Sequence, residues 1–275
     1  MNQTFKKTLY IIGLCLLIAV IFYAPQAIFS LMAVFISSLY FGLHGEIDPD
    51  TIQGNTLDAM PYFLGYVLIL SSILAVVIFA IMKYINLKEA FNTRKIQWKL
   101  VPAIIVATAA GVMATNIINE QLELDDMFGA QLAAMAQNLP GMIAIAIIGP
   151  IAEEIAFRGV LISKLREKGL GPWAAILISA FVFGAVHGNP IQIPFAMVVG
   201  VMLGIIYVKT ESVVLCSICH ILNNSYAVIM MNIYKDKSTD MTSVDLFGSQ
   251  TPVYMTLILC TILCVSFFFW YWNKK

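Results

Sequence analysis

The chain has 275 residues, of which 60% are hydrophobic and only 12% are charged, and its mean hydropathy is +0.86. A soluble domain of this length needs far more polar surface, so the composition excludes an ordinary soluble protein. Lys and Arg together number sixteen, as do Asp and Glu, and no basic stripe is present, so no nucleic-acid partner is expected. The composition predicts a protein embedded in a lipid bilayer.

Apolar segments of about 20 residues, the length that crosses the hydrocarbon core of a bilayer, recur along the chain. They cover residues 8–36, 60–82, 100–118, 141–163, 172–188, 190–208, 212–233 and 251–272. We therefore expect an all-α fold, a polytopic membrane helix bundle with about eight transmembrane helices, forming one domain over residues 1–275. The first apolar run is too long for a signal peptide and lacks a cleavage site of small residues, so we expect it to be retained.

The Lys and Arg positions decide whether residues 8–43 form one helix or two short helices broken at Pro25. With one helix, thirteen of the sixteen basic residues fall on one side of the membrane, Lys235 and Lys237 fall on the other, and Arg158 lies within a span. Eleven of the sixteen acidic residues fall in the loops that are poor in Lys and Arg. The positive-inside rule then predicts a multi-pass plasma-membrane protein with both termini in the cytoplasm.

The sequence also allows structural expectations for three segments that connect the predicted spans. Residues 126–138 are expected to form a small interfacial helix, and residues 234–250 a polar connector. The uncharged Gly188-Asn189-Pro190 sequence predicts either a tight turn or a corner buried in protein, because irregular backbone is not tolerated against lipid. We find no internal repeat.

Polar and ionisable side chains inside a bilayer are costly and usually face a polar interior. In this chain they gather in the fourth, fifth and seventh predicted spans. The residues are Glu153, Glu154, Arg158, His187, His220 and Asn224. The remaining histidine, His44, falls in a predicted outer loop. This concentration in three spans predicts a functional site.

Helical spacing indicates how these groups pair. Glu154 and Arg158 are four residues apart, so they share a helix face and can form an ion pair. Glu153 is rotated by about 100° from Glu154, which leaves its carboxylate available. His220 and Asn224 are also four apart and project together. Such groups at one depth are sufficient to activate a water and to stabilise an oxyanion.

Each of these groups taken alone also fits a structural role, because Glu–Arg pairs, His and Asn all join helices in membranes. The sequence from Cys216 to His220 also matches C-x-x-C-H, the haem attachment pattern. It lies inside an apolar span and has no second Cys pair nearby, so neither haem nor a Cys-bound zinc is expected. Both Cys216 and Cys219 are predicted to be packing residues.

At these positions the sequence resembles the CAAX-protease and bacteriocin-processing family, also called the Abi family. Residues 153–158 match its E-E-x-x-x-R motif, residues 183–187 its F-x-x-x-H motif, and residues 220–224 its H-x-x-x-N motif. The run from Gly200 to Tyr207 is similar to the penultimate segment of the family. The resemblance covers about residues 140–230, which we expect to be the catalytic core.

The resemblance implies an eight-helix intramembrane endopeptidase that hydrolyses a peptide bond of a membrane-associated peptide or protein. By analogy, Glu153 and His187 activate a water for attack on the peptide bond. His220 and Asn224 hold the developing oxyanion.

The resemblance further implies that Glu154 and Arg158 shape the site. The family has been viewed both as metalloproteases and as metal-independent, glutamate-type enzymes. Two histidines and one carboxylate are a workable set for a divalent metal such as zinc, so Glu153, His187 and His220 are possible ligands, although no cofactor is certain.

The sequence does not identify the substrate. Members of the family trim prenylated CAAX proteins, mature bacteriocins, confer self-immunity or regulate surface proteins, and the compact loops favour a bacterial chain. Two other function classes also remain. One is a proton-coupled transporter, although no inverted repeat is visible. The other is a non-catalytic membrane regulator that binds a partner protein.

Overall fold

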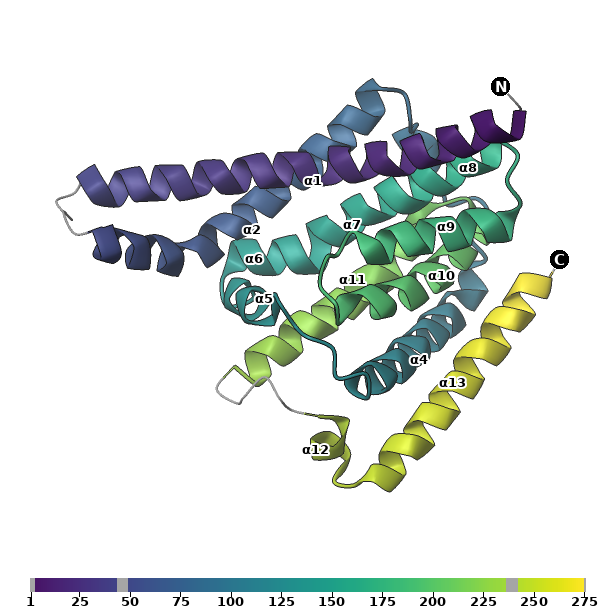
Figure 1. The fold of residues 1–275 in the computed structure, drawn as a ribbon. Coiled ribbons are helices and arrows are strands. Elements are labelled where there is room, and N and C mark those ends of the chain that lie inside the picture. The colour runs from purple at the N-terminus through teal and green to yellow at the C-terminus, as the bar shows by residue number, and fades with distance from the viewer. Residues whose placement is uncertain (1–2, 44–48, 236–241, 275) are drawn as a thin grey trace.

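The computed structural model describes residues 3–43, 49–235 and 242–274, where all regular secondary structure is helical, and the predicted all-α fold is confirmed. The side chains of residues 3–4 and 49–59, and all of His44 and Lys237, lie outside the described part. The helices, shown in Figure 1, are α1 (Gln3–Leu43), α2 (Pro49–Ile81), α3 (Leu87–Ala90), η1 (Trp98–Leu100), α4 (Val101–Glu120), α5 (Gly129–Met135), α6 (Leu139–Ile143), η2 (Ala144–Ile148), α7 (Gly149–Glu154), η3 (Ile155–Ile162), α8 (Ser163–Glu167), α9 (Pro172–Ala185), α10 (Gln192–Thr210), α11 (Val213–Ile233), α12 (Ser243–Phe247) and α13 (Gln250–Asn273).

Within the described ranges, six helices are long and apolar enough to cross a membrane, namely α1, α2, α4, α10, α11 and α13. The other two predicted spans are helical but fall outside this set. Helix α9 has only 14 residues, and the helical run from α6 to α8 changes its geometry along its length. The polytopic membrane bundle is thus confirmed, whereas the count of eight spans stays a prediction.

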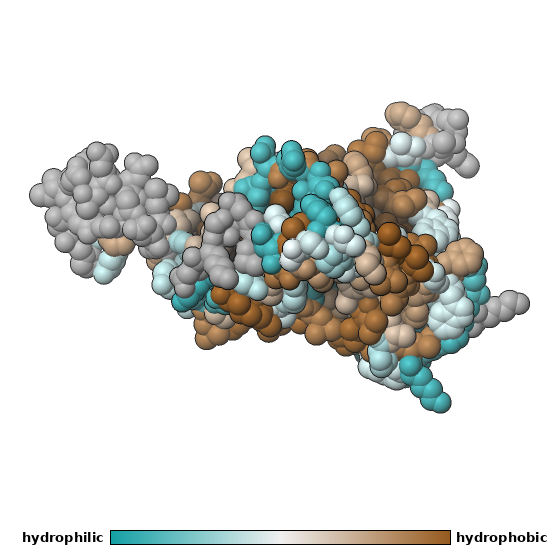
Figure 2. Space-filling view, turned by 90° about the horizontal axis from the view of Figure 1, so that it is seen from below, coloured by the Kyte–Doolittle hydropathy of each residue, from teal (hydrophilic) through white to brown (hydrophobic). Residues whose placement is uncertain are grey.

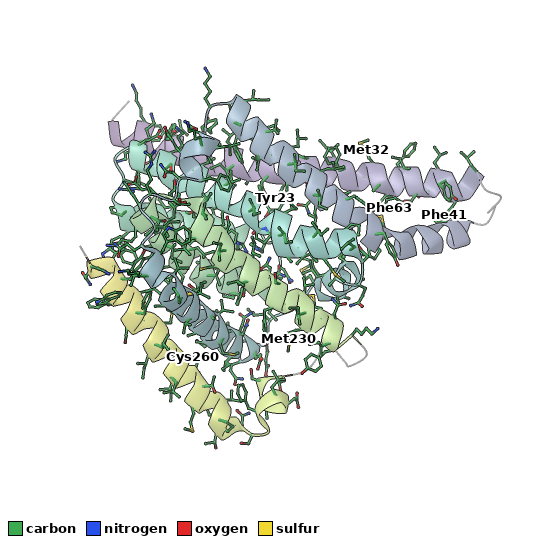
Figure 3. The ribbon with its side chains drawn as sticks, turned by 180° about the vertical axis from the view of Figure 1, so that it is seen from behind. Tyr23, Met32, Phe41, Phe63, Met230 and Cys260 are labelled. Atoms are coloured by element: carbon green, nitrogen blue, oxygen red, sulfur yellow. The ribbon has the colours of Figure 1, made fainter. Side chains whose placement is uncertain are left out.

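Helix α1 continues without a break through Pro25, so residues 8–43 are one helix, as the charge pattern predicted. Its 41 residues span about 60 Å at 1.5 Å per residue, roughly twice the thickness of the hydrocarbon core. Helix α2 packs along it, and the pair extends beyond the rest of the bundle (Figure 1). Tyr23 lies where α1 crosses the bundle, whereas Met32 and Phe41 lie on the extended part (Figure 3).

The Lys- and Arg-rich segments meet at one end of the bundle. The Lys7 ammonium donates to the carbonyl oxygen of Gly169 at 3.2 Å, which joins the start of α1 to the turn before α9. Lys209, at the end of α10, donates to the carbonyl oxygen of Lys274 at 2.7 Å. Both chain ends therefore lie at this basic end (Figure 1).

The connections that are poor in Lys and Arg meet at the opposite end. The Ser243 hydroxyl donates to the Glu120 carboxylate at 2.8 Å, which joins α12 to the end of α4. The Asn119 amide donates to the carbonyl oxygen of Ile191 at 2.6 Å, just before α10 begins. The two ends of the bundle thus differ in charge as the sequence predicted, and we call them the basic end and the acidic end.

Within the segment 126–138 a short helix is present as α5, after which the chain turns into α6; its position at the membrane interface stays a prediction. The corner at residues 188–190, which follows α9, is a turn with Gly188 exposed, Asn189 buried and Pro190 partly buried, so only its middle residue is enclosed by protein. Asn189 is fully buried, donates to the Asp126 carboxylate at 2.8 Å and accepts from the Met127 backbone N–H at 3.0 Å. Gly188 has a φ of +65°, which a residue without a Cβ adopts at little cost.

The helical run that carries Glu153 contains two wide π-helical segments, η2 and η3, on either side of α7. Pro150 lacks a backbone N–H, and its ring crowds the preceding turn, so a wider turn before it relieves the clash. Segments of this kind are frequent at functional sites. Here they flank the one turn that holds both Glu153 and Glu154.

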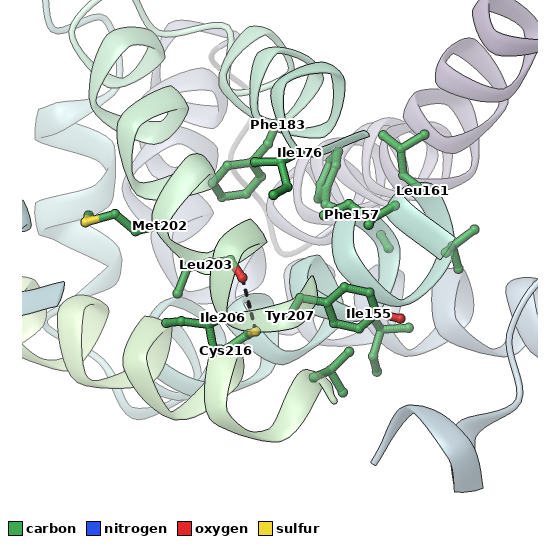
Figure 4. Packing of buried hydrophobic residues seen from close by; sticks show 14 of the residues in the cluster. Ile155, Phe157, Leu161, Ile176, Phe183, Met202, Leu203, Ile206, Tyr207 and Cys216 are labelled. Carbon is green, nitrogen blue, oxygen red and sulfur yellow. Dashed lines mark hydrogen bonds between the residues drawn. The ribbon is translucent and has the colours of Figure 1, made fainter. Parts of the chain in front are cut away.

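Helices α9 and α10 pack closely in the core (Figure 4) because glycine lies at their contact. A Cβ on Gly200 would lie 3.0 Å from both the Cα and the Cβ of Ala180, and one on Gly204 would lie 2.9 Å from Ile176. Small residues at such contacts allow two membrane helices to approach. This approach sets the position of α9, whose last turn carries Phe183.

We expect Gly200→Val to destabilise the protein by about 1–3 kcal/mol, because the added side chain overpacks a backbone contact. Thermal unfolding of the purified protein in detergent measures this loss. Gly13→Val is the matched control, since a Cβ at Gly13 meets nothing within 4 Å. Equal stability of the two variants would contradict the packing described.

The surface of the bundle is largely apolar. On the face shown in Figure 2, hydrophobic side chains cover most of the described surface, and hydrophilic ones gather in patches. Burial is uneven among the spans, with 56% of the most apolar stretch of α10 buried but only 11% of that of α13. Helix α10 is therefore a central element, while α13 lies at the periphery.

The two cysteines of the C-x-x-C-H sequence lie within the packed core. Cys216 is fully buried with its thiol 3.4 Å from the carbonyl oxygen of Leu203, and Cys219 is 4% exposed. Both thiols are free. The environment of Cys216 is that of a packing residue, and Cys219 is also largely buried but lines a cavity of about 220 Å³.

Candidate active site

The predicted pair of Glu154 and Arg158 is formed. The Arg158 Nη1 atom lies 3.0 Å from the Glu154 Oε1 atom, and both side chains are fully buried. Arg158 Nη2 also donates to the carbonyl oxygen of Gly200 at 3.4 Å, which ties the pair to α10. Because each charge neutralises the other, the pair can persist at the centre of the bundle.

His220 lies between the two adjacent carboxylates. Its Nδ1 atom is 2.8 Å from Glu154 Oε1, and its Nε2 atom is 3.6 Å from Glu153 Oε2. The imidazole is 5% exposed, so the interaction with Glu154 is shielded from solvent. The sequence assigned Glu154 to Arg158 alone, whereas the structure shows that the same oxygen also fixes the orientation of His220.

His187 presents one free ring nitrogen to the site. Its Nδ1 atom lies 2.7 Å from the carbonyl oxygen of Phe183. A carbonyl oxygen can only accept, so Nδ1 carries the proton, and Nε2 of the neutral ring remains available as an acceptor. His187 is thus arranged to accept a proton or to bind an electrophile.

Phe183 forms the aromatic wall that joins these groups. Its ring lies edge-on to His187 and His220, with centroid separations of 4.8 and 5.9 Å. The Arg158 guanidinium carbon lies 4.5 Å from its centroid, a cation–π arrangement. The presence of Phe183 in the F-x-x-x-H motif did not reveal this role, because in the sequence a Phe within an apolar helix looks like any other packing residue.

Replacement of Phe183 by Ala is expected to cost about 3–5 kcal/mol of stability, because it removes a fully packed ring and leaves a cavity. It should also lower activity, since His187 and His220 both lose their aromatic contact with the Phe183 ring. Phe181→Ala is the control on the same helix, because that side chain is 60% exposed on the outside of the bundle. Chemical denaturation followed by tryptophan fluorescence compares the two, and an equal effect would contradict the assignment.

Asn224 is held by two hydrogen bonds. Its Nδ2 atom donates to the carbonyl oxygen of Ile145 at 2.9 Å, and its Oδ1 atom accepts from Asn223 at 2.9 Å. A carboxamide nitrogen has two hydrogens, so one N–H remains to be donated. The fixed side chain thereby presents a donor of defined direction.

Two cavities meet at these side chains. One, of about 310 Å³, is lined by Glu153, His187, His220 and Asn224 together. The other, of about 340 Å³, shares Glu153, His187 and Asn224. All four predicted catalytic residues therefore line one cavity, while Glu154 and Arg158 line neither cavity and lie behind His220.

Glu153, His187 and His220 are the possible metal ligands that the sequence offers. The hydrogen-bonded Nδ1 atoms resemble the outer contacts of metal-binding histidines. Among the described residues, however, no three His, Cys, Asp or Glu side chains come close enough together to hold a metal ion. The described arrangement therefore does not form this ligand set.

Several lining residues carry no sequence motif. Tyr23, Gln26 and Ser72 come from α1 and α2, and Asn116 and Gln192 come from α4 and α10. The only sequence signal was their polarity within apolar segments, which is shared by many residues that merely join helices. They supply hydroxyl and carboxamide groups around Glu153 and His187.

Comparison with known proteins agrees with the motifs. Residues 135–226 match the family model described as Rce1-like, type II CAAX prenyl endopeptidase Rce1-like. No solved structure matches the chain. The matched segment contains η2, α7, η3, α9, α10 and the part of α11 that holds His220 and Asn224.

Two curated relatives each match a part of the chain. YdiL of Bacillus subtilis (strain 168), a protein named as a membrane peptidase, is 32% identical over 111 residues, which are 38% of this chain and 45% of YdiL. The membrane-embedded CAAX protease MroQ of Staphylococcus aureus (strain USA300) is 32% identical over 105 residues, 36% of this chain and 42% of MroQ. The alignments thus span less than half of each relative. The resemblance to the CAAX-protease family noted from the sequence is thus confirmed for residues 135–226, the segment that carries the three motifs.

Proposed function

We propose that this protein is a membrane-embedded endopeptidase that hydrolyses a peptide bond of a membrane-associated peptide or protein. The observation that carries the proposal is the shared cavity, which brings Glu153, His187, His220 and Asn224 to one space inside an apolar bundle. Four polar groups at this depth are costly unless they serve a common purpose. The family of residues 135–226 supports peptide hydrolysis as that purpose.

In the proposed mechanism a water molecule occupies the cavity beside Glu153 and His187. The Glu153 carboxylate accepts a proton from the water, whose oxygen attacks the carbonyl carbon of the peptide bond. His187 Nε2 is free to orient the water or to share its proton. The C–N bond then breaks as the proton passes to the leaving nitrogen, which yields a carboxylate and an amine.

The negative charge on the carbonyl oxygen is stabilised by donors that are already in place. The remaining Asn224 N–H is one, and Nε2–H of a protonated His220 is the second. Glu154 accepts from His220 Nδ1 and thereby stabilises the protonated ring. Arg158 neutralises Glu154 in turn, so it is a positioning residue and not a catalytic one.

The experiment that tests this function compares the membrane and secreted peptides of cells that contain wild-type protein or Glu153→Ala at equal abundance. We expect at least one peptide or protein to accumulate uncut in the Glu153→Ala cells. Identical peptide profiles, together with full complementation of a deletion phenotype by Glu153→Gln, would instead indicate a non-catalytic regulator.

A further inference from the structure

The cavities around Glu153 and His187 lie in the half of the bundle nearer the acidic end. Their lining includes Leu132 of α5 and Gln192 at the start of α10, which are acidic-end segments. Helix α9 ends there after 14 residues, and the corner that follows it is bonded to the segment after α4, where the Ile191 N–H donates to the carbonyl oxygen of Asp125 at 3.3 Å. His187 is only partly buried and Gly188 is exposed, so this end of α9 is not covered by packed protein.

In the opposite direction the site is closed by packed protein. The turn after Glu153 consists of Glu154, Ile155, Ala156, Phe157 and Arg158, all no more than 3% exposed. A separate cavity of about 880 Å³ at the basic end reaches this helix only from Gly159 onward. The two spaces are therefore divided by one continuous layer of buried side chains.

The charges of the two spaces also differ. The basic-end cavity is lined by Lys83, Arg94, Lys95, Lys164 and Arg166, among others. Neither of the two cavities around Glu153 has a Lys or Arg among its lining residues. Their carboxylates are Glu153 and Asp126, so the site shares the charge character of the acidic end.

The two cavities leave the reactive groups in different directions. One runs toward α1 and α2, where Tyr23, Gln26 and Ser72 line it. The other runs toward α4 and α11, where Asn116 and Asn223 line it. An extended peptide can lie across Glu153 with one half in each arm, held by hydroxyl and carboxamide groups that hydrogen-bond to a peptide backbone.

We infer that the site opens to the acidic end, and that the substrate is an extended peptide segment presented from the extracytoplasmic side of the membrane. The side follows from the positive-inside rule, which places the basic end in the cytoplasm. The inference of a peptide substrate rests on the proposed endopeptidase function, whereas the inferred position of the opening does not. A cytoplasmic C-terminal tail would have to pass through the buried layer between Glu154 and Arg158.

Cysteine labelling with a membrane-impermeant maleimide tests the opening directly. Ser72→Cys and Gln192→Cys place a thiol in the cavities, and wild-type protein gives the background from its five native cysteines. We expect labelling above this background in sealed right-side-out vesicles and no rise in inverted vesicles. Labelling only in inverted vesicles, or in neither kind, overturns the inference.

Matched controls test whether labelling depends on the cavity and whether the two ends of the bundle face the assigned sides. Ser217→Cys is the same change at a residue that is 5% exposed, against 6% for Ser72, but it lines neither cavity, so it should stay at background. The exposed residues Gln121 and Lys88 report the two ends of the bundle. Gln121→Cys should label only in right-side-out vesicles and Lys88→Cys only in inverted ones, and the reverse result overturns the assigned side.

The labelling is repeated in the Glu153→Ala background, so a protein without peptidase activity still reports where the site opens. Where substrates are found, their cleavage positions give an independent readout. We expect the cut bonds on the extracytoplasmic side, next to a membrane segment. Cuts confined to cytoplasmic tails overturn the inference while leaving the endopeptidase function intact.

Discussion

Glu153→Gln is expected to lower the rate of peptide cleavage by about 10²–10⁴-fold, the usual contribution of a general base. The carboxamide is nearly isosteric with the carboxylate, so the cavity keeps its shape, but it cannot accept a proton from water. The His220 Nε2 atom, 3.6 Å from the carboxylate, also loses a charged partner. Initial rates with purified wild-type and variant protein measure the effect.

The control for this change is Glu167→Gln, which neutralises an exposed carboxylate near the end of the same helical run. Glu167 pairs with Lys164 at 2.8 Å at the basic end, far along the helix from the cavity. Its replacement should leave cleavage unchanged. A loss of activity in both variants would show that charge or folding, and not the position of Glu153, is responsible.

Glu154→Leu is expected to cost about 3–5 kcal/mol of stability, because it leaves the fully buried Arg158 guanidinium without its carboxylate. His220 loses its Nδ1 partner through the same substitution. Thermal unfolding in detergent should show a large fall in the transition temperature, and the folded fraction should have little activity.

The double variant Glu154→Leu with Arg158→Leu separates folding from function. With both charges removed, the buried position is filled by apolar groups, and stability should return close to that of the wild type. Activity should not return, because His220 is no longer oriented by a carboxylate. A double variant as unstable as Glu154→Leu alone would show that the ion pair does not account for the loss.

The fold and the chemical groups of the site followed from the sequence for a simple physical reason. Membrane spans need long apolar stretches, and polar groups within them are rare enough to stand out. The i,i+4 spacing was also sufficient to pair Glu154 with Arg158, since that contact lies within one helical run. Both inferences depend on local pattern alone.

The contacts between helices did not follow from the sequence. The position of His220 between two carboxylates depends on how α11 crosses the run from α6 to α8, which hydrophobic periodicity does not encode. The π-helical segments around Glu153 are likewise invisible in an apolar pattern. Tyr23 and Ser72 line the cavity from α1 and α2, outside residues 140–230, and no local pattern in the sequence connects those helices to the motifs.

The measurement that tests the central claim most directly is cleavage in water enriched in ¹⁸O, with purified protein and a substrate identified from the Glu153→Ala cells. Hydrolysis by a water held at Glu153 predicts that the new C-terminal carboxylate gains one ¹⁸O atom with wild-type protein, and that Glu153→Gln yields almost no product. Equal amounts of labelled product from both proteins would contradict the account.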